Sequence, residues 1–166
     1  MKTWKKILIG SSLAGALVAG YNYVRNLNNA QNQLETLVSA NIHKISLSGL
    51  IVRLDITLKN PSKGSFSIKY PFVKLIYQGS TIGSSLVVDK NIKLSAFGQA
   101  VISGIMVEIP VSGILSSAFS AIKDLLADKG VKVTVKTITA IDLGWKTFDF
   151  EKTDEIILKQ AAPKQA

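Results

Sequence analysis

Hydrophobic and polar residues alternate along most of the chain after residue 42, and this alternation restricts the possible folds more than any other feature of the sequence. It is clearest between Leu50 and Leu58, where every second residue from Val52 onward is aliphatic and Arg53, Asp55 and Thr57 lie between them. Because successive side chains of a strand point to opposite faces of a sheet, the pattern predicts a β-strand with one buried face.

Residues that favour turns separate this strand from further alternating segments. Asn60-Pro61 ends it, since proline cannot donate a hydrogen bond to a neighbouring strand. We assign Asn60, Pro61, Gly79 and Gly83 to structural turns. The predicted strands begin at Ile42 and continue over residues 50–58, 66–70, 72–77, 81–88, 100–109, 131–141 and 145–158. Ile92 and Leu94 lead into the stretch Ser95–Gly98. Short strands at this spacing predict a mainly β protein, an antiparallel β-sandwich of about seven strands.

One amphipathic helix is predicted between two of these strands, over residues 112–129. Its apolar residues recur on one face at helical spacing, with Phe119 in the middle of that face. Ser112 is the expected N-cap, and Gly130 follows the last turn. We expect the helix to seal one end of the sandwich with Phe119 in the core; the alternative is that it lines a cleft for an apolar ligand or lipid.

The first 24 residues predict a membrane anchor helix. Lys2, Lys5 and Lys6 precede an uncharged run, residues 7–24. As a helix this run spans about 27 Å, close to the hydrocarbon thickness of a bilayer, roughly 30 Å. Only Arg25 closely follows it, so the excess of positive charge before the run predicts a cytoplasmic N-terminus and an extracytoplasmic domain, periplasmic or at the cell surface.

Two other interpretations of this run stay open. It has the basic start and apolar centre of a cleaved signal peptide, with small residues near Val18-Ala19-Gly20. It is also suited to packing as a helix inside a larger assembly. Ser12, Ala16 and Gly20 recur every four residues, and such a stripe of small residues lets two helices approach closely, which suggests a homo-oligomer.

A polar segment, residues 25–41, separates the run from the alternating region. Its leucines Leu27, Leu34 and Leu37 recur at helical spacing, which predicts a helical stalk or a linker. The folded domain is then expected over residues 42–160, followed by a frayed tail, residues 161–166.

The net charge of +9 suggests an anionic partner, but not a nucleic acid. Arginine is the usual reader of phosphates and base edges, and the only arginines are Arg25 and Arg53. Lysines at outward strand positions are the candidates for contact with anionic lipid or an acidic protein surface. These candidates are Lys69, Lys74, Lys132 and Lys136.

The sequence contains no arrangement of residues that points to catalysis. There is no cysteine, and the only histidine, His43, lies at the edge of the first predicted strand. The motifs HExxH, GxGxxG, GxSxG and the P-loop are absent. An acidic cluster, Asp149, Glu151, Asp154 and Glu155, is interspersed with lysines and is typical of a solvated strand edge. We expect no enzymatic activity, no metal and no cofactor.

Four motifs in order resemble the folded branch of the late embryogenesis abundant (LEA) family, whose domain is also called the water stress and hypersensitive response (WHy) domain. They are the strand Val52–Leu58 followed by Asn60-Pro61, the stretch Tyr77–Gly83, the stretch Ile92–Ala96, and Val107–Pro110 before a helix. A closing pair of strands completes the resemblance, which covers residues 42–158. This chain departs from the family at Ser95, where a proline is usual, and has no lipobox.

The resemblance implies a small β-sandwich with one helix and no catalytic centre, associated with stress protection and with binding at membranes or proteins. Together with the N-terminal run, it predicts a membrane-anchored structural or protective binding module. Two alternatives are a structural subunit of a large assembly, such as an envelope machine or virion, and a carrier of an apolar ligand or lipid.

Overall fold

The computed structural model describes residue 25 and residues 33–46, 48–110, 122–124, 127 and 129–159. The N-terminal run 7–24, the tail 161–166 and most of the predicted helix, Phe119 included, lie outside these residues. The anchor and the core position of Phe119 therefore stay predictions. Within the described residues, no helix is long and apolar enough to cross a membrane.

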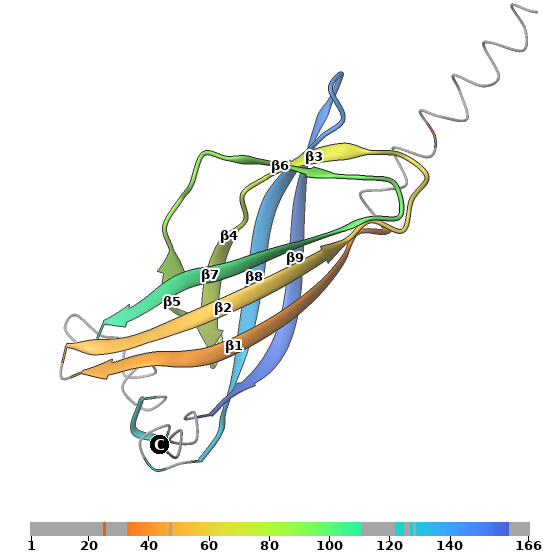
Figure 1. Ribbon diagram of the computed structural model, residues 1–166. Coiled ribbons are helices and arrows are strands. Elements are labelled where there is room, and N and C mark those ends of the chain that lie inside the picture. Colours follow the sequence, from red (N-terminus) through yellow and green to blue (C-terminus); the bar gives the residue numbers. More distant parts are fainter. Residues whose placement is uncertain are drawn as a thin grey trace, which may run out of the picture.

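Nine antiparallel strands make up the described part of the chain (Figure 1). They are β1 (Glu35–Ser46), β2 (Gly49–Lys59), β3 (Phe66–Lys69), β4 (Phe72–Tyr77), β5 (Ser80–Ser85), β6 (Asn91–Leu94), β7 (Gln99–Pro110), β8 (Val131–Asp142) and β9 (Thr147–Leu158). The prediction of a mainly β, antiparallel protein is confirmed. The expected number of about seven strands is too low, since the structure has nine, among them the short strands β3 and β6.

All nine strands are hydrogen-bonded into one sheet, in the order β1-β2-β7-β5-β4-β8-β3-β6, with β9 also paired to β8. β7 pairs with β5 through only two residue pairs near the end of β7. In Figure 1, β1, β2 and β7 pass in front of β8 and β9. Thr36 on β1 donates a hydrogen bond to Asp154 on β9, with 2.8 Å between the oxygens. The division into two separate sheets of a sandwich stays a prediction.

The domain begins earlier than the sequence indicates. The prediction that residues 25–41 form a helical stalk or linker is wrong for Glu35–Asn41, which belong to β1 and pair with β2 up to Glu35 opposite Lys59. The inward positions of this strand include Thr36 and Ala40, which are too small or polar to produce an obvious alternation. Leu37, which seemed to continue a helical stripe, lies on the outer face and is largely exposed.

Aliphatic side chains from the inward faces fill the interior. Val52, Leu54, Ile56 and Leu58 of β2 are fully buried, as the alternation predicts. The inward residues of β8 face the same core, and Ile122, in the short helical segment 122–124, also packs against it. This burial is the main stabilising contribution, at about 25 cal/mol for each square ångström of apolar surface removed from water.

The paired strands β3–β6 and β4–β5 lie one after the other along β8. Ser67 and Ile68 of β3 pair with the end of β8, and β4 pairs with its middle. Pro71 lies between β3 and β4, where the chain donates no strand hydrogen bond. After β5 the chain leaves the sheet and rejoins it at β6. The strand predicted over 81–88 therefore ends earlier than expected, at Ser85.

Two threonines on the inward face of β8 differ in how their hydroxyls are satisfied. The Thr139 hydroxyl donates to the main-chain carbonyl of Lys69. The Thr137 hydroxyl is fully buried and has no hydrogen-bond partner among the described residues. A buried polar group without a partner loses its bonds to water and gains nothing in return.

We expect Thr137→Val to raise the free energy of unfolding by about 1 kcal/mol, because the methyl group keeps the shape of the hydroxyl and removes the unpaired dipole. Thr139→Val is the matched control and should lower it by about 1 kcal/mol, since the Lys69 carbonyl then loses its donor. Urea denaturation of the two variants measures both changes. A destabilised Thr137→Val would show that its hydroxyl has a partner in solution.

Candidate functional site

The turn after β2 is organised around the side chain of Asn60, which is only 1% exposed. Its amide nitrogen donates to the carbonyls of Gly64 at 2.8 Å and Ser95 at 2.9 Å. Its side-chain oxygen accepts from the main-chain N–H and the hydroxyl of Ser62, at 3.0 and 2.6 Å. Asn60 thus ties the β2–β3 connection to the segment between β6 and β7. The contact at Ser95 uses a main-chain carbonyl, which a proline also supplies, so the departure from the family pattern preserves it.

The two glycines assigned to turns have different surroundings. Gly79 lies in the two-residue turn between β4 and β5, where Gln78 and Gly79 have φ angles of 48° and 80°; two positive φ angles are typical of a type I′ hairpin. Gly83 is not in a turn but inside β5. There a Cβ atom would lie 2.5 Å from the main-chain oxygen of Glu108, so glycine lets β5 approach β7.

Three of the four candidate lysines are paired with carboxylates. Lys69 lies 2.9 Å from Asp89, Lys132 lies 2.6 Å from Glu155, and Lys136 lies 2.7 Å from Glu151. Such exposed pairs contribute about 0–1 kcal/mol to stability. The carboxylates nevertheless reduce the attraction of these three lysines for an anionic partner, because each carries a negative charge next to the ammonium group.

Lys74, the fourth candidate, stands apart from these pairs. Its ammonium lies 5.8 Å from the centre of the Phe72 ring, and on the neighbouring strand it is opposite Lys136. The structure therefore brings Lys74 and Lys136 side by side and leaves Lys69 and Lys132 at separate places on the sheet.

The acidic cluster predicted near the C-terminus is spread along β9. Glu151 and Glu155 pair with lysines of β8, and Asp154 accepts the hydrogen bond from Thr36. No group of three His, Asp or Glu side chains converges on one point within the described residues. His43 is exposed on β1, at an irregularity in the β1–β2 pairing.

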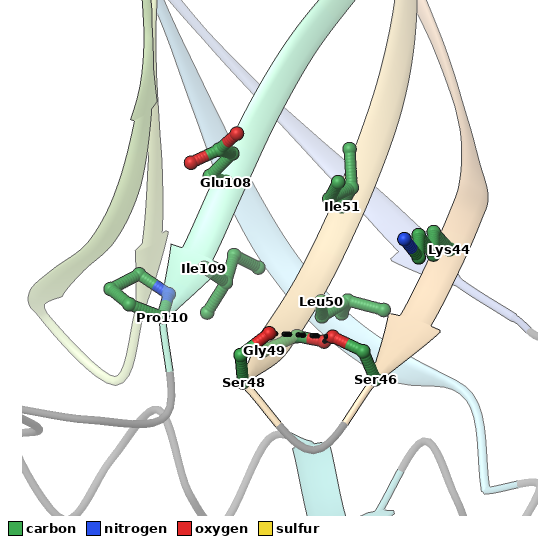
Figure 2. Close-up of a pocket in the computed structure, with 9 residues that line it drawn as sticks. All are labelled: Lys44, Ser46, Ser48, Gly49, Leu50, Ile51, Glu108, Ile109 and Pro110. Atoms are coloured by element: carbon green, nitrogen blue, oxygen red, sulfur yellow. Dashed lines mark hydrogen bonds between the residues drawn. The ribbon is translucent and has the colours of Figure 1, made fainter.

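A hollow of about 240 Å³ lies where the β1–β2 turn meets the end of β7 (Figure 2). Lys44 and Glu108 are the charged residues of its lining, and the hydroxyls of Ser46 and Ser48 lie 2.9 Å apart at its edge. Residue 47 and residues 111–121, which adjoin this lining in the chain, lie outside the described residues. We assign no function to the hollow.

Among the residues that the structure describes, the most exposed apolar ones lie where β5 leaves the sheet. Leu86 and Val87 are 83% and 81% exposed, and Val88 follows them. Both ends of this segment are fixed: Ser85 accepts a hydrogen bond from the main-chain N–H of Val73, and Lys90 accepts one at its carbonyl from Tyr70. Figure 1 shows the segment on the opposite side of the view from the start of β1.

A second group of exposed apolar residues lies at the end of the domain where the chain enters it. Phe97, in the β6–β7 turn, is 68% exposed and has a φ of 54°, which a bulky residue rarely adopts. Hydrogen bonds hold this turn: Phe97 donates to the Ser62 carbonyl, and Asn60 to that of Gly98. Trp145, in the β8–β9 turn, is 55% exposed.

Sequence reasoning missed both apolar groups. The sequence predicts a strand through Leu86 to Val88, because these are β-favouring residues that continue β5. Phe97 lies between Ala96 and Gly98, in a stretch without the alternation of a strand. No local pattern distinguishes an exposed aromatic residue in a turn from one that folds back onto the core.

The fold has counterparts among solved structures. No protein-family model and no curated protein matches the sequence. The solution structure of a protein from Arabidopsis thaliana is 18% identical and has a TM-score of 0.51, over 78% of this chain and 84% of that one. The solution structure of "a putative late embryogenesis abundant (LEA) protein" is 18% identical and has a TM-score of 0.46, over 95% of this chain and 90% of that one.

A crystal structure of a protein from Archaeoglobus fulgidus is 12% identical, with a TM-score of 0.45, over 76% of this chain and 98% of that one. At these identities the likeness concerns the fold alone. The Arabidopsis thaliana protein with the TM-score of 0.51 shares the fold of this chain, and the resemblance to the folded LEA family rests on the sequence motifs.

Proposed function

We propose that this protein is a non-catalytic binding module, held at a membrane by residues 7–24, with its β domain outside the cytoplasm. The observation that carries the proposal is the length of chain between the apolar run and the domain. The structure begins its first strand at Glu35 and buries Leu34 in the core, so nine residues, 25–33, separate the run from folded protein. So short a connection is suited to holding the domain against a membrane.

The interior of the domain supports a role through its surface rather than through chemistry. Within the described part of the domain, the buried polar side chains are hydroxyl and amide groups: Thr36, Asn60, Ser62, Ser85, Thr137 and Thr139. Asn60, Ser62, Ser85 and Thr139 bond to the main chain and thus serve the fold. The LEA-like fold suggests protection under stress as the setting, and surface contact with lipid or protein as the mechanism.

The candidate lysines contribute less to the proposed membrane attachment than the sequence predicts. A free lysine near an anionic membrane contributes about 1 kcal/mol to binding. Because Lys69, Lys132 and Lys136 are already paired with carboxylates, we assign the hold on the membrane to residues 7–24 and only an auxiliary attraction to Lys74.

Fractionation of cells that make the full chain tests the anchor. The chain should pellet with membranes and resist carbonate washing. Leu13→Arg with Leu17→Arg should release it, because two arginines inside a spanning helix cost about 5 kcal/mol. The matched control places the same charges on the exposed faces of β1 and β7, as Leu37→Arg with Val101→Arg, and should still pellet.

The sidedness of the domain is measured with single cysteines, because the chain has none of its own. A membrane-impermeant maleimide should label Thr81→Cys, which is exposed on β5, in intact cells, and should label Thr3→Cys only after lysis. A full-length chain that stays in the soluble fraction would refute the anchor. Labelling of Thr3→Cys alone in intact cells would reverse the orientation.

A further inference from the structure

The end of the domain where the chain enters carries exposed aromatic residues on two separate turns. Phe97 lies in the β6–β7 turn, and the hollow beside it is lined by Glu35 and Pro61, so it adjoins the start of β1. Trp145 lies in the β8–β9 turn, and the strand pair that leads to this turn has Asp142 opposite Ser67, close to the start of β3. Figure 1 shows these turns and the start of β1 on the same side of the molecule.

Both turns hold their aromatic residue in place. The φ of 54° at Phe97 is maintained by main-chain hydrogen bonds on either side of it. In the β8–β9 turn, Leu143 donates to the Lys146 carbonyl, and Gly144, with a φ of 88°, donates to the Asp142 carboxylate. A strained or tightly bonded turn that directs a large aromatic side chain outward points to a contact made by that side chain.

Charges of both signs lie at this end. Lys59 pairs with Glu35, Ser67 lies opposite both Lys93 and Asp142, and Lys152 and Asp154 line a hollow with Glu35 and Pro61. The ammonium of Lys146 lies 4.7 Å from the centre of the Phe148 ring. Exposed Trp and Phe match the headgroup region of a bilayer, where aromatic rings are favoured without a need for anionic lipid.

The length of the connection limits where this end lies. From Val24, the last residue of the apolar run, to Leu34 there are ten residue steps, and a fully extended chain covers at most about 35 Å in that number. The domain is attached at the same end that carries Phe97 and Trp145, so this short connection keeps both side chains at a high effective concentration near the membrane surface.

We infer that Phe97 and Trp145 insert into the headgroup region of the bilayer that anchors the chain, so that the domain lies on the membrane with its entry end down. The inference rests on the proposed membrane attachment. It names the contact surface of the domain and predicts its orientation, with β1 to β9 extending away from the bilayer and Leu86 to Val88 outside the contact.

Tryptophan emission from the full chain in phosphatidylcholine vesicles tests this orientation. The chain has two tryptophans, so Trp4→Phe makes Trp145 the only one. Its emission should shift to shorter wavelength in vesicles and should be quenched when the lipid carries bromine on its acyl chains near the headgroup. Adding Trp145→Phe and Phe97→Trp moves the probe to the other turn and should give the same result.

The matched control moves the only tryptophan to the other exposed apolar group, as Leu86→Trp in the chain with Trp4→Phe and Trp145→Phe. This probe should keep the emission of a solvated tryptophan and should not be quenched. Flotation of the same samples separates the two proposals. Chain that floats with vesicles while Trp145 stays unquenched overturns the orientation and leaves the anchor standing. If the chain does not float, both the anchor and the orientation are wrong. If only the tryptophan introduced by Leu86→Trp is quenched, the membrane contact is made by Leu86 to Val88 and the proposed orientation is wrong.

Discussion

Asn60→Ala is expected to lower the free energy of unfolding by about 3 kcal/mol. The substitution removes four hydrogen bonds at a buried position and leaves the N–H of Ser62 without its partner. The carbonyls of Gly64 and Ser95 each keep one other donor, the Ser62 hydroxyl and the Gly98 N–H. A lost hydrogen bond costs about 0.5–1.5 kcal/mol, and a buried group left unpaired costs about 1–3 kcal/mol. A domain of this size has about 5–15 kcal/mol in total, so the loss is a large fraction of its stability.

Urea denaturation followed by circular dichroism measures this loss. Asn41→Ala is the matched control, because Asn41 is exposed on β1 and its truncation should change the free energy of unfolding by less than about 0.5 kcal/mol. Equal midpoints for the two variants would mean that the network around Asn60 does not form in solution. Ser62→Ala should show a smaller loss than Asn60→Ala, since the Ser62 hydroxyl is only one of the four partners.

Gly83→Ala is expected to destabilise the protein by about 3 kcal/mol, at the upper end of the usual range for overpacking. The added Cβ would meet the main-chain oxygen of Glu108 at 2.5 Å and the side chains of Val107 and Ile109 at 3.1 and 3.0 Å. A main-chain atom in a paired strand cannot rotate away. The strands β5 and β7 would therefore have to separate at the only place where they pair, Ser84 and Ser85 with Glu108 and Val107.

Gly79→Ala is the control that separates crowding from backbone conformation. A Cβ at Gly79 has no neighbour within 4 Å, so its cost comes only from the φ of 80° and should be about 1 kcal/mol. Thermal melting of the two variants gives the comparison. If Gly79→Ala is the more destabilising of the two, then the close approach of β5 to β7 is absent in solution.

The alternation of residues predicts most of the strands with accurate bounds. The segments predicted over 72–77 and 50–58 match β4 and β2 within one residue at each end. These strands have one aliphatic face and one polar face, so the period of two is visible locally. The start of β1 is not predictable in this way, because Thr36 and Ala40 on its inward side are neither large nor strongly apolar.

The candidate site was less accessible to sequence reasoning than the fold. The role of Asn60 in a turn follows from its neighbour Pro61, but its bond to Ser95 joins residues 35 positions apart. The pairing of Lys132 with Glu155 and of Lys136 with Glu151 depends on the register of β8 against β9, which no local pattern fixes. Exposure of Phe97 and Trp145 likewise depends on which turns come together at one end.

The way β7 and β8 join the sheet also determines how the chain must fold. Hairpins such as β8–β9 and β4–β5 form between neighbouring segments, whereas Val52 pairs with Val107 and Phe72 with Ile138. Closing loops of this length costs chain entropy before the buried contacts repay it, so folding is limited by long-range encounters and takes milliseconds to seconds rather than microseconds. During that time the unpaired edges of β2 and β4 are open to other chains, and aggregation competes with folding until β7 and β8 arrive.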